Sequence, residues 1–420
     1  MSRIDLRLGA SSPQGEEFVK RCEEHAAAFR PRAAAHDREG SFPHENLAEM
    51  KESGVIAATV PQEFGGLGIE SIHDLVTGIS RLAQGDASTA IAVTMHLGPC
   101  WSLARLWRHG VAEDRRASSD ALELMLHALG RRELIVCGAG TESGTHTRYP
   151  LTEARKVDGG WAITGNKIFV TLSPEADMFH VFCRSHAPED GDTWLAARAW
   201  VPRTSEGLTL VENWDSMGMR ASGSHSLELR DCFVPDGLVF FRHKWGQWSV
   251  PELIHSAAGN LALSSAFLGI AEEAANQIEG LVRKRRKAPS NRLLAERFAI
   301  QTHVAHIEQC LSTARAILER TCRLWDAYLE AHEDGEISLE EGHQLMAEYQ
   351  CTKAVVEQNA ITAVDLALTA SGGAGYLSAS PLSRLYRDVR AGPFMQPYSP
   401  IELYEYVGKV RLCLDPSVDN

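Results

Sequence analysis

His96 and His255 are side chains of this sequence whose chemistry suits proton transfer near neutral pH. His96 lies within residues 94–98 (TMHLG), and His255 stands four residues before Gly259, so in a helix these two would share a face. A neutral imidazole is a competent base near pH 7. Each histidine also has a plainer interpretation, as a polar residue with satisfied hydrogen bonds in a core or at a helix end. The sequence leaves both interpretations open.

A basic run is the second feature with chemical potential. Residues 283–287 read RKRRK, and an arginine can hold a phosphate through two parallel hydrogen bonds. The run fits a pyrophosphate clamp, and it fits equally well the solvated face of a helix. No HExxH, P-loop or GxGxxG pattern occurs, so we predict neither a metal site nor a Rossmann-type nucleotide site.

The composition is that of a globular protein large enough for two or three structural units. The chain has 420 residues, of which 44% are apolar, and a formal net charge of −13. The acidic balance argues against a general nucleic-acid binder, which needs clustered positive charge. No run of 18 apolar residues exists, so no membrane span is expected. The nine cysteines are dispersed and the first residues lack an apolar core, which favours reduced thiols in the cytoplasm.

The elements that must position these residues fall into three segments. Residues 1–130 have apolar residues at helical spacing, residues 131–243 have short β-type runs with turn signals such as TGN at 164–166, and residues 244–420 return to long helical patterns. The predicted fold class is α+β: an N-terminal helical domain, a middle antiparallel β-barrel or sandwich domain, and a C-terminal four-helix bundle. Three apolar stripes in the last segment are interpreted as core-facing sides of helices. They begin at Leu261, His303 and Met346.

Four local motifs follow one another along the chain in an order that resembles one family. They are VPQEFGGLG at residues 60–68, GNKIFVT at 165–171, MGMRAS with LELRDCFVP at 217–235, and GGAGY with RLYRD at 372–388. Any one of them is weak. Together, with family-like spacing, they resemble the acyl-CoA dehydrogenase superfamily across essentially the whole chain.

The resemblance implies a flavin cofactor whose ring lies between the β-domain and the C-terminal helices. FAD is the expected form and FMN is the alternative. Thr171 matches the family threonine whose hydroxyl points at the flavin N5 and O4 region, and Phe169 replaces the family tryptophan beside the ring. Taken alone, both would also fit as ordinary strand residues.

The loop that begins at Cys137 takes the place of the family's TEPxAGSD segment. An ungapped count back from Thr171 puts Thr145 on the family serine and Ala139 on the family threonine. A hydroxyl for a phosphate or ribityl contact therefore persists at residue 145, while at 139 only backbone N–H groups can serve. The family aspartate becomes His146.

The adenine half of the dinucleotide is usually held in this family by a neighbouring subunit. The resemblance therefore implies a homodimer or homotetramer. Arg286 matches the arginine of the RxxFG clamp, although Phe-Gly has become Pro-Ser, and the glycine pair Gly372 and Gly373 is intact. A glutamine that commonly precedes that pair is Thr369 here.

The catalytic base of the family is missing from its usual place. In many members a glutamate eight residues after the aspartate of RxYRD removes the substrate α-proton, and eight residues after Asp388 stands Gln396. An amide cannot act as a general base near neutral pH, and such a base typically contributes ~10²–10⁴ in rate. A subset of the family carries the glutamate on an earlier helix, where this chain has Gly259. His255 and His96 are the candidate replacements.

Three functions compete on this scaffold. The first is α,β-dehydrogenation of an acyl thioester, carried by CoA or by a carrier protein, with an atypical base. The second is a flavin-dependent monooxygenase that uses reduced flavin and oxygen on a small molecule, where His96 or His255 could protonate or orient the oxygen-carrying flavin. The third is a non-catalytic flavin- or acyl-binding homologue. The first is the function that we expect from the sequence.

Overall fold

The computed structural model describes residues 4–108, 116–186, 193–332 and 337–418. Within these residues the chain runs from helices to a sheet and back to helices, which confirms the predicted fold class. The first unit contains α1 (Pro13–Glu39), α2 (His44–Ser53), α3 (Ile72–Ala83), α4 (Ala87–Arg108) and α5 (Arg116–Gly130).

The middle unit is one mostly antiparallel sheet. Its strands are β1 (Val136–Ala139), β2 (Glu153–Val157), β3 (Gly160–Val170), β4 (Met178–His186), β5 (Trp194–Pro202), β6 (Leu208–Val211), β7 (His225–Pro235) and β8 (Val239–Lys244). They are ordered β6-β7-β3-β2-β4-β5-β8, and β1 pairs with β4 in parallel. The turn predicted at residues 164–166 is wrong, because β3 continues through it with a register shift between Ile163 and Gly165. A glycine inside a strand often marks such a bulge.

The last unit is built on three long helices, α6 (Val250–Val282), α7 (Phe298–Ala331) and α8 (Leu339–Ser371), with α9 (Pro381–Val389) and α10 (Pro400–Arg411) after them. The stripes that begin at Leu261, His303 and Met346 are buried over most of their length, which confirms that they face the core. By length and composition α6 could cross a membrane, but 72% of its most apolar window is buried inside the fold. A core helix therefore accounts for its apolar composition.

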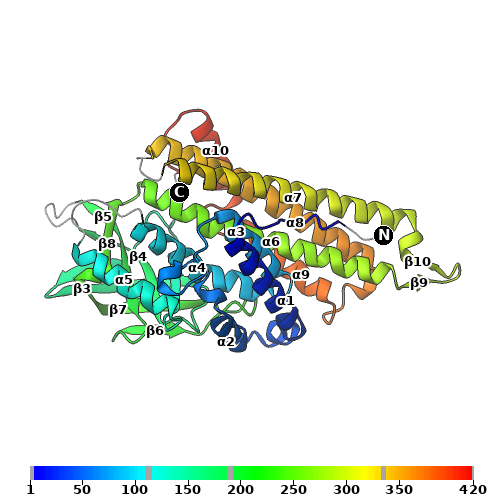
Figure 1. Ribbon diagram of the computed structural model, residues 1–420, viewed down its shortest axis with the longest axis horizontal. Coiled ribbons are helices and arrows are strands. Elements are labelled where there is room, and N and C mark those ends of the chain that lie inside the picture. Colours follow the sequence, from blue (N-terminus) through cyan, green and yellow to red (C-terminus); the bar gives the residue numbers. More distant parts are fainter. Residues whose placement is uncertain (1–3, 109–115, 187–192, 333–336, 419–420) are drawn as a thin grey trace.

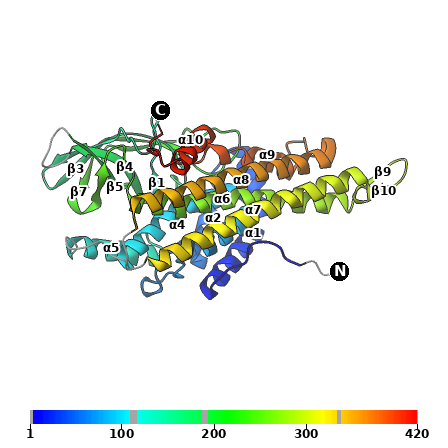
Figure 2. The ribbon, with the colours of Figure 1, turned by 90° about the horizontal axis from the view of Figure 1, so that it is seen from above.

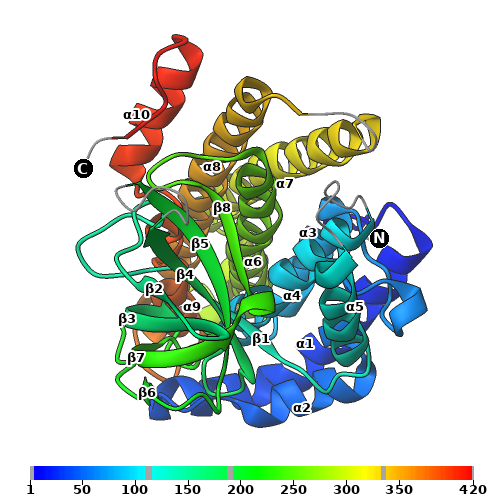
Figure 3. The same cartoon turned by 90° about the vertical axis from the view of Figure 1, so that its left-hand side faces the viewer.

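The sheet and the far ends of the long helices lie at opposite ends of the molecule. In Figures 1 and 2 the helices run from the sheet toward a small hairpin, β9 (Arg286–Lys287) with β10 (Arg292–Leu293). Seen from the sheet end, α6 and α8 pass behind the strands, α3 to α5 lie to one side, and α1 and α2 run below (Figure 3). The sheet thus meets the helices along one face, where a site between them would form.

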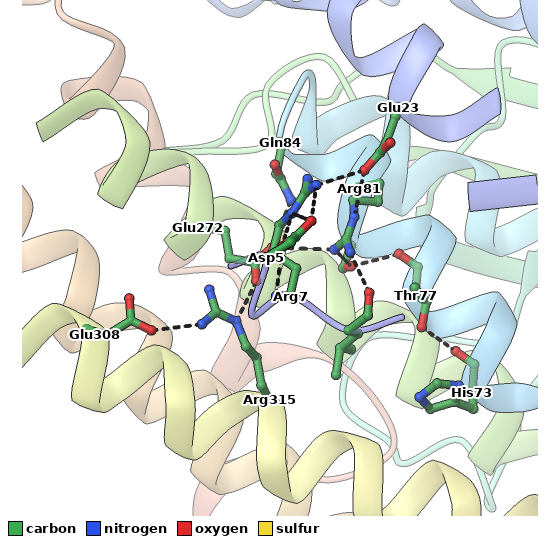
Figure 4. A network of polar contacts seen from close by, with 12 residues as sticks. Asp5, Arg7, Glu23, His73, Thr77, Arg81, Gln84, Glu272, Glu308 and Arg315 are labelled. Atoms are coloured by element: carbon green, nitrogen blue, oxygen red, sulfur yellow. Dashed lines mark hydrogen bonds and ion pairs between the residues drawn. The ribbon is translucent and has the colours of Figure 1, made fainter. Parts of the chain in front are cut away.

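A buried ionic network holds α6 in register with its neighbours (Figure 4). Arg81 of α3 pairs with Glu23 of α1 at 3.0 Å, and Arg315 of α7 pairs with Glu272 of α6 at 2.8 Å. Gln84 also donates to Glu272 at 2.8 Å. Both carboxylate oxygens of Glu272 are bonded, one to Gln84 and one to Arg315, which fixes the position of α6 relative to α3 and α7. The helix α6 carries His255 and Gly259.

Candidate active site

Gln396 lies between α9 and α10 in a segment that faces α8. Its side chain is half-buried, and among the described residues its Oε1 atom has no hydrogen-bond partner although it is buried. Its backbone carbonyl accepts one long hydrogen bond, of 3.5 Å, from the Tyr349 hydroxyl. A buried acceptor without a donor is unusual in a folded protein and fits a group that a ligand N–H or O–H completes.

Lys353 of α8 secures the segment that carries Gln396. Its buried ammonium donates to the carbonyl oxygen of Tyr398 at 2.7 Å and also to that of Met395. One turn further along α8, Glu357 lies against Gly392, and burial raises the pKa of its carboxyl, while the charge of Lys353 opposes this rise.

His146 closes the same segment from the β1–β2 loop. Its Nε2–H donates to the carbonyl oxygen of Pro397 at 2.8 Å, and its Nδ1 accepts from the backbone N–H of Arg148 at 3.2 Å. The ring stacks on Tyr398 with centroids 5.1 Å apart. Burial, with help from the charge of Arg148, lowers the pKa of His146 to about 4. The imidazole that replaces the family aspartate is thus neutral and structural.

His255 lies at the crossing of α4 and α6. Its Nδ1 is hydrogen-bonded to the Ser102 hydroxyl, and the ring of His180 from β4 stands edge-on with centroids 6.1 Å apart. One turn away the helices touch through glycines, because a methyl group on Gly98 would lie 3.4 Å from the Gly259 Cα. A methyl group on Gly259 would meet no atom within 4 Å, so there is open space next to this glycine.

His96 has both ring nitrogens occupied by backbone groups. Nε2 bonds the carbonyl oxygen of Ile56 at 2.9 Å, and Nδ1 accepts from the N–H of Val136 at 3.1 Å. The ring is fully buried, and burial lowers its pKa to about 4. In this arrangement the side chain links α4 to β1 and has no nitrogen available for a substrate.

Phe169, Thr171 and Cys137 come together at the end of β3. The Phe169 backbone has a φ of 55°, and its ring is 58% exposed, with the Trp214 ring edge-on at 6.0 Å. The Thr171 hydroxyl bonds that of Ser224 at 2.7 Å, and the Cys137 thiol donates to the Thr171 carbonyl at 2.8 Å. A positive φ is costly for a phenylalanine, and backbone strain of this kind clusters at ligand sites.

The side chains of Ala139 and Thr145 make contacts within the scaffold. Ala139 is buried within the sheet, opposite Val181 of β4. The Thr145 hydroxyl donates to the carbonyl oxygen of Tyr149 at 2.8 Å. Neither side chain makes a described hydrogen bond to the cluster at Thr171.

Arg286, Gly372 and Gly373 lie at the end of the bundle remote from the sheet. Arg286 is in β9 at the tip of the molecule (Figure 1), where it donates to the Asn291 carbonyl at 2.8 Å. The neighbouring Arg285 reaches the carbonyl of Ser371, directly before the glycine pair, at 3.3 Å. The structure thus brings these three residues near one another and keeps them apart from Phe169 and Thr171.

The RLYRD motif joins all three units of the fold. Arg387 pairs with Asp37 of α1 at 2.5 Å, and Asp388 accepts from the backbone N–H of Met219, in the loop before β7, at 2.7 Å. Burial raises the pKa of Asp388 to about 6. These bonds are structural, because each ends on another part of the scaffold.

A cavity of about 550 Å³ lies on the far side of α6. Its lining includes Arg30 of α1, Glu273 of α6, Lys284 just after α6, and Leu382 of α9. Lys284 belongs to the basic run at 283–287, whereas none of the candidate histidines, Gln396 or the residues matched to the flavin site lines this cavity. We therefore place the candidate active site at the Gln396 segment and its surroundings.

Comparison with protein families finds three consecutive matches. Models of the acyl-CoA dehydrogenase N-terminal, middle and C-terminal domains match residues 12–118, 137–232 and 261–395. Together these matches cover most of the chain in the order of the three units.

Comparison with individual proteins finds relatives of nearly full length. The amino sugar nitrososynthase RubN8 of Streptomyces rubradiris is 33% identical over 413 residues, which cover 98% of this chain and 93% of the relative. The L-evernosamine nitrososynthase of a Micromonospora strain is 33% identical over 389 residues, which cover 92% and 88%. The solved structure of KijD3 with FMN and dTDP-3-amino-2,3,6-trideoxy-4-keto-3-methyl-D-glucose matches with a TM-score of 0.89 at 30% identity, covering 98% of this chain and 97% of that one.

Proposed function

Because the chain belongs to the acyl-CoA dehydrogenase family, we propose that it is a flavin-dependent oxygenase on that scaffold, which oxidises the nitrogen of an amino sugar. Gln396 is the observation that carries the proposal, because an amide replaces the base that thioester dehydrogenation requires. The second known position of that base is Gly259, which has no side chain to take a proton. The relatives above 30% identity whose names refer to amino sugars and nitroso products support the same reaction class.

The residues at the end of β3 fit a flavin. The exposed Phe169 ring offers a flat apolar wall, and the hydroxyls of Thr171 and Ser224 offer hydrogen bonds to a polar ring edge. The unpartnered Oε1 of Gln396 offers an acceptor for an N–H or O–H group. FMN and FAD share the ring that these groups would contact, so the fit supports a flavin of either kind.

The proposed reaction needs no α-proton removal. Reduced flavin supplies two electrons and two protons when bound, one oxygen atom of O₂ is transferred to the amine nitrogen, and the other leaves as water. The amine R–NH₂ thereby becomes the hydroxylamine R–NHOH. A second cycle with the same stoichiometry gives R–NO, with two waters formed in that cycle.

The side chains of this chain would orient the amine. Gln396 can accept a hydrogen bond from an amine N–H and so direct the nitrogen lone pair, without taking a proton itself. His255, whose Nδ1 is bonded to Ser102, stands one helical turn before Gly259, and in this proposal it bonds a sugar hydroxyl or takes up a proton. His96 has no role in this proposal beyond holding α4 against β1.

We further propose that the enzyme is a homo-oligomer. If Arg286 and the Gly372–Gly373 pair contact a flavin dinucleotide, that flavin must belong to another copy, because these residues lie at the opposite end of the molecule from Phe169. A dimer and a tetramer both allow such an exchange of residues.

The experiment that tests the reaction is an oxygen-dependence assay on the purified protein. The protein is supplied with flavin, a flavin reductase, NADH and a nucleotide-linked amino sugar, and the product is analysed by mass spectrometry. We expect incorporation of one oxygen atom from ¹⁸O₂ into the amine, and no product without oxygen.

Two further arms separate the proposal from its alternatives. Anaerobic bleaching of the bound flavin by an acyl-CoA would instead support the dehydrogenase expected from the sequence, and a protein that binds no flavin would contradict both enzyme functions.

Gln396→Ala should lower kcat/KM for the amine about tenfold, which is the effect of losing one hydrogen bond at the reacting group.

A further inference from the structure

Arginine and aromatic side chains alternate along a strip that starts at the candidate active site. We define the Arg–aromatic strip by these residues: Trp248, Arg148, Tyr149, Trp245, Arg184 and Trp194. The Arg148 guanidinium lies over the Trp248 ring at 5.7 Å and over the Tyr149 ring at 5.4 Å. Tyr149 meets Trp245 edge-on at 4.9 Å, and Arg184 lies over Trp245 at 5.6 Å and over Trp194 at 4.3 Å.

The strip is held in place by the backbone. Trp245 donates its backbone N–H to the carbonyl of Trp194 at 3.0 Å, and Gly246 donates to the carbonyl of Arg148 at 3.1 Å. Gly246 has a φ of 82°, and a methyl group on it would lie 2.4 Å from the Tyr149 ring. A glycine is therefore required for this ring to pack where it does.

Arg148 is a buried cation that has no direct ion pair among the described residues, although its charge helps to lower the pKa of Asp415. It is 5% exposed, and no carboxylate of the described residues forms an ion pair with it. Its Nε has no hydrogen-bond partner, and its Nη2 reaches only the Val418 carbonyl, at 3.4 Å. Arg184, by comparison, pairs with Glu153 at 2.9 Å. The two aromatic rings beside Arg148 offset part of the cost of burying its charge, and an anion would complete the site.

The inner end of the strip touches the Gln396 segment. Trp248 donates its indole N–H to the Tyr398 hydroxyl at 3.2 Å, and His146 bonds both the Pro397 carbonyl and the Arg148 N–H. Further out, Tyr149, Trp245 and Trp194 are only half-buried. A molecule that extends from Gln396 along the strip would therefore meet a cation first and partly exposed aromatic rings after it.

We propose that the Arg–aromatic strip binds a nucleoside diphosphate carried by the substrate, with the diphosphate at Arg148 and the base against Tyr149 and Trp245. Arginine gives phosphate two parallel charge-assisted bonds, which are much stronger than the present contact to the Val418 carbonyl. Aromatic side chains bind bases by stacking. This inference rests on the proposed oxygenase function and names its substrate class, an amino sugar attached to a nucleotide.

FAD also carries a nucleoside diphosphate, so the source of the ligand has to be tested. The residues that resemble an adenine clamp, Arg286 with Gly372 and Gly373, lie at the opposite end of the molecule. This location leaves the strip to the substrate. FMN, which lacks a diphosphate, provides the reference cofactor.

Calorimetric titration of the full-length protein separates the two sources. The FMN-saturated protein is titrated with dTDP, and the flavin-free protein with FMN and with FAD. For Arg148→Gln we expect the Kd of dTDP to rise tenfold or more, as for loss of a charged hydrogen bond, while the Kd values of FMN and FAD change less than twofold. Arg155→Gln, which removes an exposed arginine of the same sheet, is the matched control and should leave all Kd values unchanged.

Trp245→Ala is the second variant, because its half-buried ring can be removed with little risk to folding. It should weaken dTDP binding several-fold and leave FMN binding unchanged. The proposal is overturned if the wild type does not bind dTDP, if both variants bind it normally, or if FAD rather than dTDP is the ligand weakened by Arg148→Gln. The titration measures binding, and the oxygen-dependence assay measures turnover, so the two proposals can fail separately. An active oxygenase that prefers a free amino sugar would overturn this inference alone. A protein that binds dTDP but has no oxygenase activity would overturn only the proposed function.

Discussion

The ammonium group of Lys353 lies 2.7 Å from the backbone carbonyl oxygen of Tyr398 and so ties the middle of α8 to the chain beyond Gln396. A second donation, to Met395, holds the segment on the other side. Gln396 is therefore positioned by its neighbours' backbone, although its own side chain has a free acceptor. A buried cation that holds two carbonyls gives rigidity at a cost in desolvation, which is seen in the lowered pKa of Lys353.

Replacing Lys353 tests this clamp. Lys353→Met leaves two carbonyls without their donor, and we expect a loss of about 2 kcal/mol in the free energy of unfolding together with reduced turnover. Glu357→Gln is the matched control, because it replaces a buried carboxyl one turn away and leaves both carbonyl bonds of Lys353 in place, and it should change stability by less than about 1 kcal/mol. Urea denaturation measures both. Equal losses in the two variants would contradict a specific role for the two bonds from Lys353 to the backbone carbonyls.

The His255–Ser102 contact predicts graded effects on catalysis. His255→Ala should lower kcat/KM ten- to hundredfold and remove one limb of its pH profile, because an imidazole near the substrate either bonds it or transfers a proton. Ser102→Ala should cost less, since it removes only the group that orients the ring. Steady-state kinetics from pH 6 to 9 provide the measurement. An unchanged turnover in His255→Ala would exclude it as the replacement for the missing base.

The exposed ring of Phe169 should serve flavin binding more than folding. Phe169→Ala is expected to weaken flavin binding about tenfold and to shift the melting temperature only slightly, because the ring is already 58% exposed. Phe233→Ala, on β7 and 50% exposed, is the control and should bind flavin normally. Fluorescence quenching of FMN reports the affinity. Loss of stability without loss of affinity would contradict the assignment.

The buried His96 predicts sensitivity to acid. Its pKa is about 4 in the folded protein and 6.5 as the ordinary value, so the unfolded chain takes up the proton first as pH falls. The corresponding stability is full above pH 6.5, and roughly 3 kcal/mol of it is lost as pH falls toward 4. His96→Gln should be less stable at pH 7.5 but lose less stability on acidification. Calorimetry between pH 7.5 and 5 tests this, and a pH slope in His96→Gln equal to that of the wild type would contradict it.

The order of the units and the core-facing helix sides were predictable, because burial imposes a period that a single sequence displays. In strand β3, by contrast, the sequence predicted a turn that the structure does not contain. Gly165 looks like a turn residue, but it stands inside the strand, where a methyl group would lie 2.2 Å from the Thr152 hydroxyl. A glycine required by a close approach cannot be distinguished from one required by a turn without knowing which strand lies beside it.

The candidate site was predictable only in part. The positions of Gln396, Phe169 and Thr171 followed from the motifs, and the structure places the latter two together. Lys353 was missed, although a lysine in line with the buried Tyr349 and Val356 on α8 is a signal that it has a buried partner. The Arg–aromatic strip joins residues from four separate segments of the chain, so no local sequence pattern could predict it.

The bonds of Arg387 to Asp37 and of Asp388 to Met219 have a consequence for how such proteins are classified. These side chains are occupied in joining helices to the sheet and touch no reacting group, so selection can retain them through any change of chemistry. A search pattern centred on RLYRD therefore groups enzymes by architecture. Sorting them by reaction requires the residues that the pattern leaves out, beginning eight positions later at Gln396.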